Sequence, residues 1–185
     1  MEQSRAQVAE PDIWVVFAPI KKTRLDFLVE KATELGASRL IPILTERTDV
    51  KRVNVDRLSA TAMEAAEQSE RLSVPIITQP VSLHDLIEGW PENRRLFIMD
   101  ETGRGEPAAS AFISHRETSE SNTLAAIMVG PEGGFSGSEL DAVRNLPFVT
   151  RVTLGVRVLR AETAVAAALS NWQMLAGDGC VVRNR

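Results

Sequence analysis

Short apolar segments alternate along this chain with segments of helical periodicity, and this alternation limits the folds open to it. The apolar segments have the length of buried strands and lie at 13–20, 39–44, 74–78, 94–100, 125–129 and 151–155. Helices are expected between and after them, at 24–35, 56–72, 83–90, 108–115, 138–145 and 162–175. Strands that alternate with helices indicate an α/β fold, in which helices cover both faces of a mostly parallel sheet.

The overall composition narrows the class of protein further. The 185 residues are enough for one domain with a sizeable core. The only cysteine, Cys180, excludes an intramolecular disulfide and favours a cytoplasmic setting. No apolar run approaches the length of a membrane span. The net charge of −4 disfavours a protein that binds nucleic acid through bulk positive charge.

The most glycine-rich stretch, GPEGGFSGSEL, covers residues 130–140. It follows the apolar segment 125–129, and its run from Ser136 to Glu139 matches a capping box, which predicts the start of a helix. Glycines at such a place let the backbone turn sharply or approach a ligand closely. The residues alone leave two interpretations open, a ligand-binding turn and a tight turn without a ligand.

A second distinctive segment, LGVRVLRAETAVAAAL, covers residues 154–169. It ends the last expected strand, forms a loop with two arginines and enters the final helix. Glu162 and Thr163 lie at the positive end of that helix, where a carboxylate or a hydroxyl is favoured. Taken alone, the segment is better explained as an alanine-rich core helix preceded by solvated arginines.

Several common site motifs are missing from the sequence. There is no GxxxxGK[ST] phosphate loop, no GxGxxG after the first strand and no GxSxG nucleophile turn. His84 and His115 lie far apart in the sequence, and we interpret both as surface histidines without clustered carboxylates or cysteines. No metal site is therefore expected.

Taken together, GPEGGFSGSEL and LGVRVLRAETA resemble the paired C-terminal motifs of the RsmE family. The resemblance continues upstream through KKTRLDFLVEKATELGASRLIPILTERT (21–48) and AAEQSERLSVP (65–75), so it covers about residues 13 to 175. Members of this family are methyltransferases of the SPOUT superfamily that methylate a uridine of 16S ribosomal RNA at N3. The resemblance implies a deep trefoil knot at the C-terminal end of the fold, S-adenosyl-L-methionine as cofactor, the small ribosomal subunit as partner and a homodimer.

The resemblance also implies which residues form the site. The positions that it assigns to cofactor binding lie in the two motifs and are Val129, Gly130, Glu132, Gly133, Gly134, Leu154, Gly155, Val158, Leu159, Arg160, Thr163 and Ala164. Arg160 is also the candidate catalytic residue, since a cation stabilises the charge that develops on the uracil oxygens, and Glu162 is expected to orient it. A salt bridge between the two without a catalytic duty is equally open. No general base is identified.

Five cations are candidates for RNA contacts. Lys21, Lys22 and Arg24 open a helix, where positive charge opposes the helix dipole. This arrangement favours phosphate binding, although a solvated helix start explains it equally well. Arg47 and Arg71 match the family's upstream blocks and extend the expected RNA surface, although Arg71 is also spaced for an ordinary ion pair with Glu67.

One departure from the family concerns the N-terminus. Family members begin with an RNA-binding domain of the PUA type, whereas here about a dozen polar residues precede the matching segment. We therefore expect a tail or linker remnant at 1–12, a SPOUT methyltransferase domain at 13–178 and a tail at 179–185, as in a trimmed chain or a natural short form. The alternative function is a knotted domain that binds cofactor or RNA without catalysis.

Overall fold

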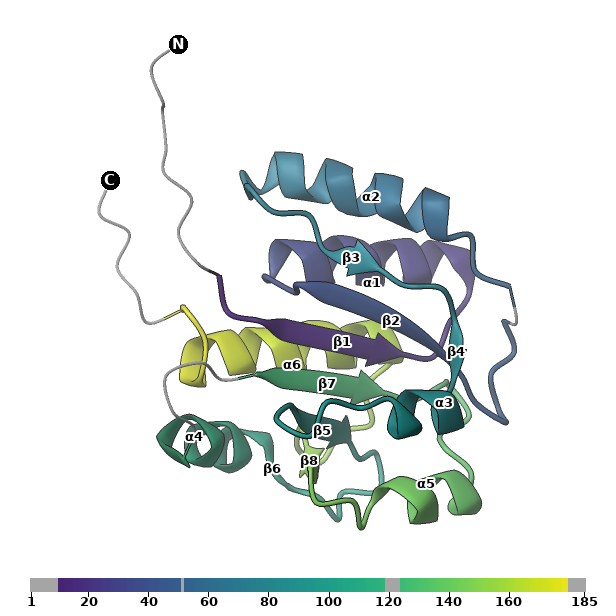
Figure 1. The fold of residues 1–185 in the computed structure, drawn as a ribbon, viewed down its shortest axis with the longest axis vertical. Coiled ribbons are helices and arrows are strands. Elements are labelled where there is room, and N and C mark those ends of the chain that lie inside the picture. Colours follow the sequence, from purple (N-terminus) through teal and green to yellow (C-terminus); the bar gives the residue numbers. More distant parts are fainter. Residues whose placement is uncertain (1–9, 51, 119–123, 180–185) are drawn as a thin grey trace.

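The computed structural model describes residues 10–50, 52–118 and 124–179, which form a parallel sheet flanked by helices (Figure 1). Within these residues the strands are β1 (Ile13–Phe17), β2 (Arg39–Leu44), β3 (Ile76–Ile77), β4 (Val81–Ser82), β5 (Arg95–Met99), β6 (Glu106–Pro107), β7 (Ala125–Val129) and β8 (Val149–Thr153). The helices are α1 (Lys22–Glu34), α2 (Val55–Gln68), α3 (Leu83–Glu88), α4 (Ala108–Thr118), α5 (Gly137–Val143) and α6 (Ala161–Leu175). Every strand pairing among them is parallel, so the predicted fold class is confirmed.

The strand order shows that the last two strands in the sequence, β7 and β8, each lie between two strands that come earlier in the sequence. The sheet runs β3-β2-β1-β7-β5-β8-β6, with β4 paired to β2. Strand β7 thus lies between β1 and β5, and β8 lies between β5 and β6. Because parallel strands end at the same edge of a sheet, the carboxyl ends of β5, β7 and β8 lie next to one another.

Helices cover both faces of the sheet, and alternate strand residues point into two separate cores. Ile127 of β7 belongs to the larger core, with buried residues of α1, α2, α4 and α6. Its neighbour Met128 belongs to the smaller core, with residues of α3 and α5. All five residues of β7 are buried, since the strand has neighbours on both edges and both faces. Strand β7 is therefore an inner strand of the sheet that contributes side chains to both cores.

A buried arginine joins three strands at the amino-terminal edge of the sheet. Arg94 is 3% exposed and donates hydrogen bonds to the carbonyl oxygens of Asp12 (2.8 Å) and Ala125 (2.9 Å). Its guanidinium also pairs with the Asp12 carboxylate and lies over the Trp14 ring, 3.7 Å from the ring centre. Burial alone raises the pKa of Asp12, but hydrogen bonds from Ser38 and Arg94 outweigh it and hold this pKa below its ordinary value.

Asp12 is therefore part of the folded domain, and the prediction that it belongs to a tail is wrong. Glu10 is also tied to the domain, through Arg71 and Ser73. Residues 1–9 and 180–185, most of the two predicted tails, lie outside the described residues.

Helix α2 ends four residues earlier than predicted, at Gln68. Glu70 takes a left-handed conformation (φ 57°), which the helix cannot continue through. The backbone N–H of Arg71 then bonds the carbonyl oxygen of Ala66 (2.9 Å), the pattern of a Schellman cap. Leu72, the last residue of the predicted helix 56–72, consequently lies beyond α2 and is 53% exposed.

Smaller differences concern short strands. The predicted strand 74–78 contracts to β3, and β4 follows it as a separate strand immediately before α3. Strand β6 lies between the predicted strand 94–100 and the predicted helix 108–115, where no strand is expected, and pairs with β8 through Glu106 and Pro107. Two-residue strands have no side-chain periodicity, so the sequence does not signal them.

Candidate functional site

A cavity of about 440 Å³ opens where β5, β7 and β8 end. Its walls come from the segments that follow these strands, namely 99–103, 129–135 and 153–161, together with the start of α1 and α6. A crevice at the carboxyl ends of parallel strands is where open α/β sheets bind ligands. The volume falls in the range of sites for small molecules, about 300–1,000 Å³.

The glycine-rich segment after β7 forms one wall as a tight turn that is anchored to a helix. Gly134 has φ +68° and its N–H bonds the carbonyl oxygen of Pro131 (2.9 Å). A Cβ at Gly130 would lie 2.8 Å from the Phe135 ring, so a side chain there has no room. Glycine at position 130 thus lets the backbone pack closely against Phe135 in the cavity wall.

The capping box that follows anchors this turn twice. Ser136 Oγ accepts the N–H of Glu139 (3.2 Å), and Glu139 Oε2 accepts the N–H of Ser136 (2.8 Å), as the sequence predicted. The second carboxylate oxygen, Oε1, accepts the N–H of Glu46 (2.8 Å) from the segment after β2. The cap of α5 therefore also joins two loops that are distant in the sequence.

The segment after β8 forms the opposite wall and is mostly exposed. Gly155 has φ +108°, a conformation that favours glycine. The next segment carries two apolar side chains that are exposed to solvent, Val156 (97% exposed) and Val158 (76% exposed). Apolar residues that line a cavity while exposed to water are typical of a surface that a ligand covers.

The segment after β5 forms the floor and is held by a buried carboxylate. Asp100 accepts hydrogen bonds from the N–H (2.9 Å) and Oγ1 (2.7 Å) of Thr102 and pairs with Arg151 of β8. Burial alone raises the pKa of Asp100, but the Thr102 hydrogen bonds and the Arg151 cation outweigh it and hold the pKa below its ordinary value. Asp100 is thus an ionised anchor for the floor.

Arg24, from the first turn of α1, is the cation at the cavity that is held in place. Its Nη1 pairs with the Glu132 carboxylate of the glycine-rich segment. Its Nε lies 3.8 Å from Glu162 Oε1 in the first turn of α6. One guanidinium therefore joins three segments that are far apart in the sequence.

Comparisons with known proteins agree with this geometry. The sequence model of a family described as RNA methyltransferase domain matches residues 8–173. The chain is 33% identical over 179 residues to a ribosomal RNA small subunit methyltransferase E of Rickettsia conorii, covering 97% of this chain and 70% of that one. A relative of the same name from Bacillus subtilis is 32% identical over 168 residues, which cover 85% of this chain and 65% of the relative.

A solved structure extends the match to three dimensions. It is a ribosomal RNA small subunit methyltransferase E from Neisseria gonorrhoeae bound to S-adenosyl methionine, with a TM-score of 0.80 and 30% identity. The match covers 91% of this chain and 68% of that one.

The chain belongs to the RsmE family of RNA methyltransferases. The resemblance seen in the sequence is thereby confirmed, and the fold is that of the SPOUT methyltransferases. The chain spans about two thirds of the length of these RsmE relatives.

Most residues that the RsmE motifs predicted for the cofactor line the cavity. They are Val129, Gly130, Glu132, Gly134, Leu154, Gly155, Val158, Leu159, Arg160 and Ala164. Thr163 is exposed and is not among the lining residues. Gly133 is also not among them, because its Cα faces Arg47, whose Nη1 donates to the Gly133 carbonyl oxygen (2.9 Å).

The sequence prediction missed one wall. The site predicted from the sequence contains no residue of the floor after β5, yet this segment supplies Met99, Asp100, Glu101, Thr102 and Gly103. The two known walls extend through Pro131, Phe135, Leu140, Thr153, Val156, Arg157 and Ala161. A signal for the floor existed, because an apolar strand followed by polar turn residues marks the carboxyl end of a parallel strand.

The predicted pairing of Glu162 with Arg160 is wrong. Glu162 lies near Arg24, and among the described residues the Arg160 side chain forms no ion pair or hydrogen bond. Arg160 occupies the N-cap position of α6 and is exposed at the cavity. The sequence could not reveal this exchange of partners, because Arg24 and Glu162 are distant along the chain.

The structure also rearranges the candidate RNA-binding cations. The Arg71 side chain is only 8% exposed, and it donates to the carbonyl oxygens of Thr33 and Ala37 (3.1 Å for the latter). It thus ties α2 to the end of α1, at the opposite edge of the sheet from the cavity, and is not available to RNA. Lys21 and Arg47 line a shallow groove beside Glu132, and Lys22 is exposed nearby at the start of α1.

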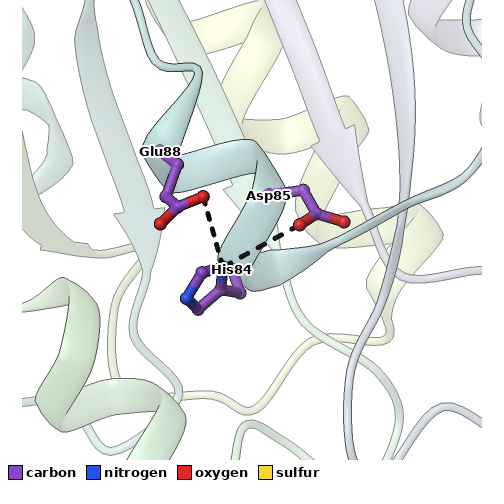
Figure 2. A group of neighbouring side chains, drawn as sticks. All are labelled: His84, Asp85 and Glu88. Atoms are coloured by element: carbon purple, nitrogen blue, oxygen red, sulfur yellow. Dashed lines mark ion pairs between the residues drawn. The ribbon is translucent and has the colours of Figure 1, made fainter.

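The histidine predictions need correction as well. His84 is not free of clustered carboxylates, since its Nδ1 lies 3.8 Å from Asp85 Oδ1 and 3.7 Å from Glu88 Oε2 on α3 (Figure 2). All three side chains are exposed, which is common without any ion. His115 is half-buried rather than a surface residue, and its ring packs edge-on against Phe97. Burial lowers the pKa of His115.

Within the part of the chain that the structure describes, no helix has the length and apolarity required to cross a membrane.

Proposed function

We propose that this chain transfers a methyl group from S-adenosyl-L-methionine to N3 of a uridine in 16S ribosomal RNA. The single observation that carries the proposal is the cavity at the ends of β5, β7 and β8, built from the two motifs of the RsmE family. A relative with the same fold and 30% identity was crystallised with S-adenosyl methionine, which supports this ligand for the cavity.

The residues present suit this cofactor. A side chain at Gly130 or Gly134 would collide with Phe135 or Glu101, which line the cavity, so glycine lets the turn pack closely against these residues. The exposed apolar loop with Val156 and Val158 offers a surface for an adenosine or thioether group. When bound, S-adenosylmethionine supplies an electrophilic methyl group on a sulfonium centre. We infer that the cavity-lining residues predicted from the sequence, Arg160 among them, hold this ligand.

The work left for the protein is positioning and charge stabilisation. Methyl transfer is an in-line displacement, so holding the acceptor nitrogen against the methyl carbon supplies much of the rate. The uracil N3–H is lost before transfer, which leaves negative charge on the ring carbonyl oxygens. A cation placed before the reaction at those oxygens stabilises that charge.

We also propose phosphate contacts beside the cavity. Lys21 and Arg47 line one shallow groove together with Asp49 and Glu132, and the exposed Lys22 follows Lys21 in the chain. Exposed cations in such a cluster fix the register of a nucleic-acid backbone. Replacing Lys21 and Lys22 together by glutamine should weaken RNA binding and flatten its dependence on salt concentration, while cofactor affinity stays unchanged.

Methyl transfer is tested directly with the full chain, labelled S-adenosylmethionine and small ribosomal subunits that lack the modification. We expect label in 16S ribosomal RNA and a reverse-transcription stop at one uridine, because a methyl group on N3 blocks base pairing. Cofactor binding without label in RNA would overturn the proposed activity and leave the alternative, a binding domain without catalysis.

Three further features of the family are proposed for this chain, namely a trefoil knot, a homodimer and a cytoplasmic location. The insertion of β7 and β8 between earlier strands supports a knotted path. The exposed Met174 (57%) and polar residues on the outer side of α6 offer a surface for a second subunit. Sedimentation should give about twice the 20.3 kDa chain mass, and a monomer with full cofactor affinity would contradict the dimer.

A further inference from the structure

Arg24 occupies an unusual place among the charged residues of the cavity. The charged groups that line it are Arg24, Asp100, Glu101, Glu132, Arg157 and Arg160. Of the three arginine side chains, only that of Arg24 makes an ion pair or hydrogen bond with other described residues. A cation held before the substrate arrives stabilises developing charge without the cost of ordering its own side chain.

Two carboxylates fix the guanidinium and leave part of it unused. Glu132 binds Nη1, and Glu162 lies nearest to Nε. No described residue accepts a hydrogen bond from Nη2 of Arg24, so two N–H donors remain for a ligand. The guanidinium can then donate from Nη2 to the uracil carbonyl oxygen beside N3, which leaves the N3 electron pair free to form the new bond.

The two carboxylates differ in how firmly they hold Arg24. The Glu162 side chain is 12% exposed, whereas the Glu132 side chain is 41% exposed. Exposed ion pairs contribute little, so an anionic ligand can replace Glu132 at small cost while Glu162 keeps the guanidinium in place. Glu162 thus fixes the position of Arg24, whereas the contact between Arg24 and Glu132 can be exchanged for a contact with a ligand.

We propose that Arg24, rather than Arg160, is the catalytic cation that contacts the acceptor uracil and stabilises its N3-deprotonated form. This inference rests on the proposed function. In the step, the N3 proton passes to solvent and its electron pair stays on the ring, shared with the carbonyl oxygens beside Arg24. The N3 electron pair then forms the bond to the methyl carbon, the carbon–sulfur bond breaks, and its electron pair stays on sulfur as a neutral thioether.

The chain offers a matched control for this residue. Arg57 on α2 pairs with Asp26 of α1, and the side chains are 30% and 34% exposed, close to the 36% and 41% of Arg24 and Glu132. Arg57 does not line the cavity. Arg57→Gln therefore removes a comparable surface ion pair without touching the site.

The experiment compares wild type, Arg24→Gln, Arg24→Lys and Arg57→Gln in two assays, after thermal unfolding shows that each is folded. Single-turnover transfer to small ribosomal subunits should fall about a hundredfold in Arg24→Gln, the cost of a lost oxyanion donor. It should fall about tenfold in Arg24→Lys, which keeps the charge but loses the planar fork. Affinity for S-adenosylhomocysteine, measured by calorimetry, should change less than threefold, and Arg57→Gln should match wild type in both assays.

The pH profile separates stabilisation of the anion from a structural role. Because Arg24 lowers the pKa of the bound uracil N3, its loss should move the rising limb of the transfer rate to higher pH.

Wild-type transfer rates in both Arg24 variants would overturn the inference and leave the proposed function standing. An equal fall in cofactor affinity and transfer would also overturn it, making Arg24 a cofactor-binding residue. If wild type itself transfers no methyl group, the proposed function fails and this inference fails with it. If Arg24→Gln does not fold, Arg24→Lys carries the test.

Discussion

At the scale of single residues, the cavity depends on backbone conformation and on one buried carboxylate. Gly134 has a left-handed φ of +68°, and a Cβ there would collide with the Glu101 carboxylate. Gly137, three residues later, begins α5, and a Cβ added to it would meet no other atom within 4 Å. The two glycines therefore make a matched pair, one required and one replaceable.

Gly134→Ala should lower the free energy of unfolding by about 1–2 kcal/mol, because alanine is strained in the left-handed region. It should also weaken S-adenosylhomocysteine binding, since the turn forms a wall of the cavity. Gly137→Ala should leave both unchanged or slightly raise stability, as alanine favours a helix. Urea unfolding and calorimetry measure the two quantities, and equal behaviour of the two variants would contradict the role assigned to the turn.

Asp100→Asn tests the anchor of the floor through its dependence on pH. The pKa of Asp100 is held below its ordinary value of 3.8 in the folded chain, so the ionised form stabilises the fold above that pH. This contribution is lost as the pH falls through the lowered value, because the folded state then takes up the proton as well. At pH 7 the variant should be less stable by about 2 kcal/mol, the scale of hydrogen bonds to a charged group.

The difference between Asp100→Asn and wild type should shrink progressively as the pH falls below 3.8. Urea unfolding at several pH values measures it. A difference that stays constant down to the acid limit would mean that the carboxylate charge contributes nothing to holding the floor.

At the scale of elements, the capping box of α5 joins helix stability to the shape of the site. Ser136→Ala should cost about 1 kcal/mol of stability, the usual effect of a lost N-cap. It should also weaken S-adenosylhomocysteine binding, because the cap fixes the end of the glycine-rich turn. Ser82→Ala is the control, since the Ser82 side chain also accepts an N–H at the start of a helix, α3, but that helix does not follow a segment that lines the cavity. Equal cofactor affinity in the two variants would show that the cap of α5 has no influence on the site.

The elements also show which features of the fold and the site can be predicted from the sequence and which cannot. Periodicity and capping residues predicted the main strands and helices, because these signals are local. The end of α2 at Gln68 was missed, since it depends on Glu70, which is not a residue type expected in a left-handed conformation. Both motif loops were predicted at the cavity through the family resemblance, whereas the floor at Asp100 and the position of Arg24 arise from contacts between distant segments. Such contacts leave no periodic pattern in one sequence.

At the scale of the whole molecule, the order of the sheet explains why the site lies where it does. Strands β7 and β8 enter between strands placed earlier in the chain, and the loops that follow them meet the segment after β5 at one edge. The cavity therefore exists only when the last third of the chain has taken its place. A ligand that binds there should stabilise the whole fold, by about 2.7 kcal/mol at a hundred times its dissociation constant.

Calorimetric titration of S-adenosylhomocysteine into the full chain tests the central claim, that this cavity is the cofactor site. We predict one ligand per chain for wild type. Binding should be lost or much weakened in Ala164→Leu, which fills a lining position, and kept in Ala167→Leu, on the same helix but away from the cavity. No heat of binding with folded wild-type chain, or equal affinity in the two variants, would contradict the account.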